Sequence, residues 1–458
     1  MLRVPSVMLL AVALTGCTTL GQSYVAPTIN QTARYANGGA HGSKTVTAEV
    51  QWWRSFNDPV LNTLVERGLA QNLTVAQAVE RVVAARQSAI AAGLNNLPSG
   101  SAVAQSTASG TTTAVNREVA NNLTTSFNWE IDLFGKLARE REAALATLDA
   151  SVEAANGARL SLIGEIARTY VQARGFQDRL HIARSTLQAQ NRTLDVTQQQ
   201  KEAGVTSALD LAQLRGDVST TAAAIPALEI SLSESIHRLA VLLGQAPSAL
   251  ESTFTNGAQI PRTAAKVSAG IPADLLRDRP DIRQAERELA AATADIGVAE
   301  ADLYPSLSLG GSFTLASIAT WSLGPSLSVP VFNRGQLKAT VRLEESQARQ
   351  SYLAYQETVL VAVEEVENAL VGFSKQQTRR SQLASSYTSY SQATELAEER
   401  YTVGETTLLT LLTAQRSLYS ARDYLAQSSV DVALQYIALS LALGGGWAIT
   451  SSNWKVGP

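Results

Sequence analysis

Apolar residues recur at helical spacing along several long stretches of the chain, and none of these stretches has an internal proline. The clearest stripe consists of Tyr352, Tyr355, Val359, Val363, Val366, Leu370 and Phe373, which step by three or four residues. This spacing is typical of helices that pack against other helices as in a coiled coil. The pattern and an Ala-, Gln-, Glu- and Leu-rich composition predict helices over roughly 59–95, 137–202, 281–303 and 337–402. A single helix over 137–202 would be about 100 Å long, so it has to lie against other long helices.

Short segments in which apolar and polar residues alternate lie between these helices. They predict strands near 101–109, 123–132, 306–315 and 323–331, the first of which is mostly Ala, Ser, Thr and Gly. Alternation over about ten residues is typical of a transmembrane β-strand, with Trp129 and Trp321 as candidates for the aromatic girdles. A half-buried strand of a soluble sheet has the same alternation, so the pattern alone leaves both interpretations open.

The first seventeen residues are organised like a bacterial lipoprotein leader. Arg3 precedes the apolar run Val7–Leu14, and the motif LTGC ends at Cys17. We expect cleavage before Cys17, a diacylglyceryl group on its thiol, and acylation of the new amino group by a fatty acid such as palmitate. An ordinary secretory leader with a chance cysteine is the alternative. Thr18, where an aspartate would indicate retention in the inner membrane, favours the outer membrane. Cys17 is the only cysteine of the chain, which excludes a disulfide or a zinc–thiolate site.

Four predicted strands are too few to close a barrel within one chain. After the leader no run of 18 or more apolar residues occurs, so the sequence predicts no transmembrane helix and any membrane-spanning region would have to consist of β-strands. The smallest outer-membrane barrels have eight strands, whereas three protomers of about four strands each would supply about twelve. If the strands span a membrane, a barrel can close only when several protomers combine, so we expect an α+β membrane protein that oligomerises.

The two halves of the chain resemble each other when one is shifted by 200 residues. Seven positions between 201–244 and 401–444 are then identical, among them Gly204/Gly404 and Gly244/Gly444. Each half is predicted to contain a helix, two strands, a long helix, a turn and a second helix. Gly204 and Gly404 lie where the long helices must reverse, a place that favours a residue tolerant of left-handed geometry. The expected segments are a lipoprotein signal peptide (1–16), a lipidated N-terminal segment (17–58), a first repeat (59–250), a linker (251–274), a second repeat (275–446) and a C-terminal tail (447–458).

Candidate catalytic and metal-binding residues are few. The net charge of −3 provides no basic footprint for nucleic acid. His41, His181 and His237 lack the spacing of metal ligands, and no HExxH motif, nucleophile elbow or phosphate loop occurs. The run Arg279–Pro280–Asp281 fits a helix start better than a catalytic cluster, since Pro280 suits the first turn and Asp281 the helix dipole. We expect no catalysis, no metal and no cofactor besides the lipid on Cys17.

Four segments carry a resemblance to a known family. They are WWRSFNDPVLNTLVERGLAQNLTVAQA at 52–78, GIPADLLRDRPDIRQAERELAAATADIGVAEADLYPSLSLGGSF at 270–313, GPSLSVPVFNRGQL at 324–337 and RYTVGETTLLTLLTAQRSLY at 400–419. In type and order they resemble the outer-membrane factor family of TolC- and OprM-like exit ducts, in its lipoprotein branch. The resemblance extends from about Trp52 to Gly446.

The resemblance implies how such a chain would work. A trimeric 12-stranded barrel in the outer membrane would continue into a long α-helical barrel in the periplasm, surrounded by a mixed equatorial region that includes the segments near 245–275 and the C-terminus. A periplasmic adaptor would dock at the turns marked by Gly204 and Gly404 and link the duct to an inner-membrane transporter of the RND type. Drugs and other small molecules would pass through passively, which would contribute to antibiotic resistance.

The same resemblance assigns gate residues at the periplasmic tip. Leu409 would face the lumen of the closed tip, and Tyr401 and Arg416 would belong to the network that holds the inner helices shut. Many relatives carry an aspartate where this chain has Thr413, whose hydroxyl cannot form an ion pair with the arginine. An ionic contact at that position is therefore not expected. Ordinary helix packing is the alternative role for all four residues.

Two functions of different class remain at this stage. The preferred one is a passive export duct in the outer membrane that extends into the periplasm. The alternative is a non-conducting periplasmic coiled-coil lipoprotein that acts as a scaffold. Only a barrel would conduct ions through a bilayer, so conductance separates the two.

Overall fold

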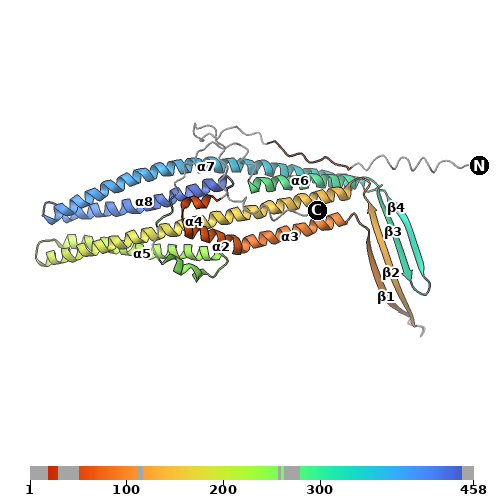
Figure 1. The fold of residues 1–458 in the computed structure, drawn as a ribbon, viewed down its shortest axis with the longest axis horizontal. Helices are drawn as coiled ribbons and strands as arrows, with labels where there is room; N and C mark the ends of the chain where they lie inside the picture. Colours follow the sequence, from red (N-terminus) through yellow and green to blue (C-terminus); the bar gives the residue numbers. More distant parts are fainter. Residues whose placement is uncertain (1–18, 29–50, 111–116, 256–258, 263–278, 446–458) are drawn as a thin grey trace, which may run out of the picture. The chain divides into compact units, whose positions relative to one another are not determined.

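The computed structural model describes residues 19–28, 51–110, 117–255, 259–262 and 279–445, and long helices predominate in this part of the chain (Figure 1). No described helix combines the length and the hydrophobicity needed to cross a membrane. In chain order the elements are η1 (Trp52–Phe56), α2 (Pro59–Gln71), α3 (Leu73–Leu94), β1 (Ser99–Gly110), β2 (Arg117–Ile131), α4 (Lys136–Glu202), α5 (Ala208–Leu242), η2 (Pro247–Phe254), α6 (Pro280–Ala301), β3 (Ser306–Leu315), β4 (Thr320–Ser328), α7 (Arg334–Thr402) and α8 (Leu408–Ala442).

The described residues form two compact units. The first draws on 19–28, 78–155 and 281–359, and contains the strands, α6 and the N-terminal parts of α4 and α7. The second draws on 51–77, 156–255 and 360–445, and contains η1, α2, α5, α8 and the C-terminal parts of α4 and α7. Each unit therefore combines residues from both halves of the sequence.

The four strands pair antiparallel in the order β1-β2-β3-β4 (Figure 1). The register places the apolar residues of β2, β3 and β4 on one face, as in the pairs Trp129↔Leu309 and Phe313↔Trp321. The opposite face is polar, and a row of serines crosses all four strands there: Ser101, Ser126, Ser312 and Ser322. Their hydroxyls hydrogen-bond at 3.2 Å between the first two and at 2.9 Å between the last two. The alternation in the sequence is thus a division of the sheet into two faces.

The apolar face of the sheet is exposed in the protomer. Phe127, Phe313, Leu323 and Leu327 are all exposed, and Trp321 retains 78% of its accessible surface. A contiguous exposed apolar face of this kind marks contact with a membrane or with another protein.

The predicted strand positions are close to the observed ones, but β2 begins at Arg117, six residues earlier than expected, and β4 ends at Ser328, before Pro330. Proline has no N–H to donate to a neighbouring strand.

The helix predicted over 59–95 is divided in the structure, which corrects the sequence prediction. Asn72 adopts an extended conformation between α2 and α3. Its side-chain oxygen accepts from the N–H of Val75 at 2.9 Å, and its amide nitrogen donates to the carbonyl of Leu242 at 2.8 Å. Asparagine is a preferred N-cap residue because its side chain satisfies a free N–H of the first turn. One buried side chain therefore starts α3 and caps the end of α5.

The predicted start of α6 agrees with the structure. The helix begins at Pro280, with Asp281 in its first turn. Arg279 is buried, and its guanidinium donates to the carbonyl of Ala442 at the end of α8 and pairs with Glu365 at 2.7 Å. Arg279, the residue before α6, thus contacts the end of α8 within the second unit.

Glycine notches bring α8 close to its neighbours in the second unit. An added Cβ on Gly164 or Gly175 of α4 would clash with Leu441 or Val430 of α8, respectively. The same applies to Gly372 of α7 against Gln435 of α8. Such close approach lets long helices pack tightly along α8, which matches the predicted helix-on-helix arrangement.

Candidate functional site: the helical hairpin turns

Two helical hairpins, α4–α5 and α7–α8, reverse direction in the same way. Gly204 and Gly404 have φ of 76° and 78°, as their predicted place in the turns requires. The N–H of the following residue reaches back to the carbonyl of Gln200 in the first hairpin and of Arg400 in the second, each at 2.8 Å. A left-handed glycine with this backward hydrogen bond is the Schellman end of a helix.

The return helices also begin alike. Ser207 accepts from the N–H of Asp210 at 3.1 Å, and Thr407 accepts from the N–H of Thr410 at 3.4 Å. Both are hydroxyl N-caps, and Asp210 completes a capping box. Each turn is therefore specified locally, by a glycine that ends one helix and a hydroxyl residue that starts the next. The glycine and the N-cap residue of one turn lie 200 residues from their counterparts in the other turn.

Tyr401, one of the predicted gate residues, connects the two hairpins. Its hydroxyl donates to the side-chain oxygen of Gln200 at 2.9 Å, and Thr206 donates to the same oxygen at 3.2 Å. The ring packs against a buried apolar cluster of Leu214, Leu408, Leu411 and Leu412. Tyr401 thus has an apolar contact and a polar contact that both cross between hairpins, and sequence reasoning did not find Gln200, its partner.

Arg416 forms an ion pair with Asp217 of α5, with 3.3 Å between Nε and the carboxylate. The arginine side chain is 54% exposed and the aspartate 18%. Thr413 lies one turn before Arg416 and donates its hydroxyl to the carbonyl of Leu409 in its own helix, at 2.8 Å. The carboxylate that the sequence lacks at 413 is therefore supplied by a different helix. A 200-residue shift maps Ser417, not Arg416, onto Asp217, so the internal repeat did not point to this pair.

Leu409 is half-exposed, in contrast to the buried leucines on either side of it. It lies one residue from Leu408 and two from Leu411, so it projects from a different face of α8. Leu409 does not belong to the buried cluster that contains Leu408, Leu411 and Leu412. Gly204 and Gly404 are equally open, since an added Cβ would meet nothing within 4 Å.

Farther along α8, two further ion pairs connect it to its neighbours. Asp423 accepts two hydrogen bonds from Arg179 of α4, at 2.7 and 3.1 Å, and Asp431 pairs with Arg379 of α7 at 2.9 Å. Burial, together with Asp423, raises the pKa of the neighbouring Tyr419, which therefore stays neutral at physiological pH. With Arg416–Asp217, α8 has an ion pair to each of the other three helices of the two hairpins.

No cluster of three or more His, Cys, Asp and Glu that could hold a metal occurs among the described residues. Cys17 and His41 lie outside them.

Comparison with known proteins identifies the family to which the chain belongs. The family described as outer membrane efflux protein matches residues 64–245 and 271–445. Nodulation protein T of Rhizobium leguminosarum bv. viciae is 37% identical, over 94% of this chain and 91% of that protein. The pyoverdine export outer membrane protein OpmQ of Pseudomonas putida is 34% identical, over 88% of this chain and 89% of that protein. The solved outer-membrane channel OprN is 34% identical and superposes with a TM-score of 0.84, over 93% of this chain and 99% of that one. By its fold, its length and the two matched regions, this chain belongs to the outer membrane efflux protein family.

Proposed function

We propose that this protein is the outer-membrane exit duct of a tripartite efflux pump and that it conducts small molecules passively. The observation that carries the proposal is the four-stranded sheet, with one exposed apolar face and one polar face. β1 and β4 are its edges, and each pairs on one side only among the described residues. Because the strands alternate in direction, β4 of one protomer and β1 of the next can pair antiparallel. Three protomers would close a barrel of about twelve strands with the apolar face toward lipid.

Membership of the family determines where the protein works: in the outer membrane, extending into the periplasm. The proposal adds a homotrimer, a lipid on Cys17, a periplasmic adaptor and an RND-type inner-membrane transporter as partners, and no chemistry of its own. We also propose an internal two-fold repeat with the segment boundaries given above. Two observations support it: the matching turns of the two hairpins, and the corresponding contacts of Asn72 with Leu242 and of Arg279 with Ala442. One relative is named for pyoverdine export, and we infer a small organic cargo here as well. The scaffold alternative accounts for neither the apolar sheet face nor the family.

The proposed gate consists of Tyr401, Leu409, Thr413 and Arg416. The contacts of Tyr401 with Gln200 and of Arg416 with Asp217 support it, because both join α7–α8 to α4–α5 near the turns. An adaptor that binds at Gly204 and Gly404 would weaken these contacts and so separate the hairpins. Thr413, whose hydroxyl is used within α8, is expected to contribute less than Arg416.

The proposal is tested on the purified full chain in detergent and in planar bilayers. We expect a trimer by mass, mixed helix and strand content by circular dichroism, and stepwise ion conductance after insertion. A monomer that inserts without conductance would show that the protein is a scaffold. Mass spectrometry of the mature N-terminus separately tests the lipid, which an unmodified Cys17 would exclude.

A further inference from the structure

The segment that follows the lipid-attachment cysteine lies against the beginning of α4 and against α6. We call residues 19–24 the N-terminal strap. The N–H of Leu20 donates to the carbonyl of Phe134, in the turn between β2 and α4, at 3.0 Å. At the other end of the strap, the hydroxyl of Tyr24 donates to Glu286 of α6 at 3.2 Å. Burial and the Glu286 carboxylate raise the pKa of Tyr24, which keeps the hydroxyl protonated as a donor. All these residues belong to the first compact unit.

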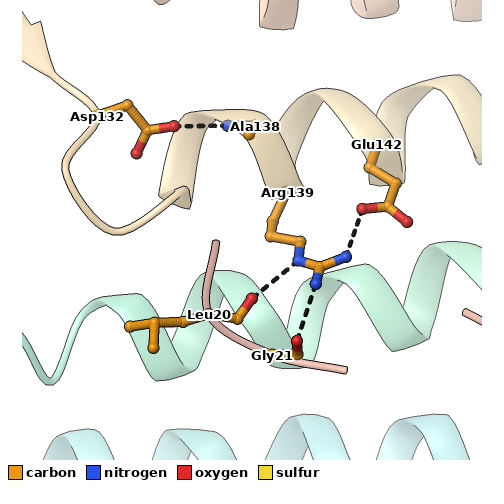
Figure 2. Close-up of polar contacts among 6 residues, drawn as sticks. All are labelled: Leu20, Gly21, Asp132, Ala138, Arg139 and Glu142. Carbon is orange, nitrogen blue, oxygen red and sulfur yellow. Dashed lines mark hydrogen bonds and ion pairs between the residues drawn. The ribbon is translucent and has the colours of Figure 1, made fainter. Parts of the chain in front are cut away.

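Arg139 of α4 makes the central contacts with the strap, and only 5% of its surface is exposed. We call the site formed by these contacts the Arg139 seat. Its Nε donates to the carbonyl of Leu20 and its Nη2 to that of Gly21, both at 2.9 Å, while Nη1 pairs with Glu142 at 2.6 Å (Figure 2). The Asp132 carboxylate accepts from the N–H of Ala138 at 2.9 Å and so caps the first turn of α4, from which Arg139 projects (Figure 2). A buried guanidinium that serves two consecutive carbonyls holds a backbone in place, because charge-assisted hydrogen bonds to the main chain do not depend on its side chains.

Three glycines fix the register of the strap in its seat. Gly21 has φ of +83°, and an added Cβ would lie 2.6 Å from the Cα of Gly297 on α6. Gly297 in turn leaves room for the stem of Arg139, whose Cγ would be 3.0 Å from a Cβ there. Gly135 has φ of +78°, and a Cβ on it would clash with Thr19. Because only glycine tolerates both the conformation and the close approach, Gly21 must lie opposite Gly297 when the strap is seated.

The position of the strap relative to Cys17 suggests what it is for. Thr19 is two residues beyond Cys17 in the sequence, which is at most about 7 Å of chain. We propose that the Arg139 seat fastens the strap so that the lipid on Cys17 is coupled to the junction where β2 ends and α4 begins. The acyl groups and the sheet then meet the membrane as one unit, whereas an unrestrained chain would let the lipid move independently. This role in anchoring rests on the proposed lipidation, but the seat itself does not.

Hydrogen–deuterium exchange of the full chain in detergent tests the seat. Arg139→Gln removes both carbonyl contacts that hold the strap, so the amide of Leu20, which donates to Phe134, is expected to exchange at least about tenfold faster than in the wild type. Arg141→Gln on the same helix is the matched control, since Arg141 is exposed, and it should leave exchange unchanged. Gly21→Val changes no helix and should reproduce the effect of Arg139→Gln. Unchanged protection in both Arg139→Gln and Gly21→Val would overturn the seat.

A double-mutant cycle tests the coupling to the lipid. The readout is the amount of heat-resistant folded protein recovered in the outer-membrane fraction, with N-terminal mass spectrometry reporting lipidation. Arg139→Gln is expected to lower this recovery in the acylated protein and to have no further effect in a Cys17→Ala background. An equal loss in both backgrounds would mean that Arg139 merely stabilises the fold, and would refute the coupling. If Cys17 proves unmodified, the proposed lipidation fails, and the exchange experiment still decides whether the seat exists.

Discussion

Arg416 pairs with a carboxylate on α5, whereas the partner considered from the sequence was at position 413 on α8. A residue at 413 is three positions from Arg416 on α8, and a side chain there interacts within the same helix. Asp217 belongs to α5 and reaches Arg416 only because the two hairpins pack together. An ion pair within a helix has no effect on whether hairpins separate, whereas one between helices opposes separation. The position of the acid therefore changes the role of the pair.

We predict that Arg416→Ala and Asp217→Asn each increase passive leakage through the channel. The pair is partly exposed, so its loss should cost about 0.5–1 kcal/mol and shift the closed–open balance by up to about fivefold. The measurement is conductance of the purified protein in bilayers or uptake of a large antibiotic by cells. The double variant should leak no more than either single variant. Arg215→Ala is the control, because Arg215 of α5 hydrogen-bonds to Gln198 of α4 within the same hairpin. Additive effects of the two substitutions would show that the residues act separately.

Asp295 on α6 differs from Asp217, because its charged neighbours are carboxylates and not an arginine. Burial, followed by Glu344 and Glu140, raises its pKa above the ordinary value of an aspartate. The folded protein therefore binds this proton more readily than the unfolded chain does. The contribution of Asp295 to stability consequently falls as the pH rises from the ordinary pKa through the raised one, and the penalty is complete at neutral pH.

Asp295→Asn is accordingly predicted to raise the thermal unfolding midpoint at neutral pH. The gain should shrink as the pH is lowered toward about 4, where the wild-type carboxyl is increasingly protonated. Thermal melts of the detergent-solubilised protein at several pH values measure it. The exposed Asp195→Asn on α4 is the matched control and should give no comparable gain. A gain that is independent of pH would mean that the effect is not one of protonation.

At the scale of elements, the hairpin turns are the part of the candidate site that local sequence specifies best. Glycine at 204 and 404 and a hydroxyl residue three positions later produce the same turn twice. The division between α2 and α3 was missed, because Asn72 resembles any polar residue in a helical pattern. Its N-cap role is consolidated by a contact with Leu242, 170 residues away. Secondary structure that depends on distant partners of this kind leaves little signal in a local pattern.

The turns offer a prediction that separates two roles of glycine. Gly404→Val should abolish pump-dependent resistance, since a β-branched residue disfavours positive φ, while expression and trimer formation stay near normal. Gly404→Asn tolerates the left-handed conformation but adds a side chain. If the Asn variant keeps the resistance and adaptor cross-linking that the Val variant loses, the conformation of the turn is what matters. If it loses them as well, the adaptor requires a residue without a side chain at this position. The same pair of substitutions at Gly204 is the parallel test. Full efflux and cross-linking in the Val variants would refute docking at the turns.

At the scale of the whole molecule, the proposed function gives the protein two separate attachments to the membrane, the apolar sheet face and the lipid on Cys17. We predict that Cys17→Ala abolishes lipidation while part of the protein still resists extraction by alkaline carbonate, because the apolar sheet face remains. Fractionation and mass spectrometry measure the two effects. Trp321→Asp, on the apolar face of β4, should reduce insertion even when Cys17 is lipidated. Complete release by Cys17→Ala alone would show that the sheet does not insert.

The sequence by itself determined the features that depend on neighbours close in the chain. Helical stripes, strand alternation and glycine turns are all local patterns, and the periods of 3.6 and 2 residues are set by backbone geometry. The existence and approximate ends of α4, α6, α7 and all four strands were therefore predictable. The family could also be recognised, since its motifs are contiguous segments. The two faces of the sheet followed from the same alternation.

Only the tertiary structure decided which distant residues meet. Gln200 with Tyr401, Asp217 with Arg416, and Arg139 with the carbonyls of Leu20 and Gly21 are separated by 100 residues or more in the chain. A side chain that contacts a backbone carbonyl leaves no complementary residue in the sequence, so the Arg139 seat has no motif. Ion pairs between helices depend on the rotation of each helix about its axis, and that rotation is determined by packing along its whole length. Local patterns specify the elements, and the packing of those elements selects the partners.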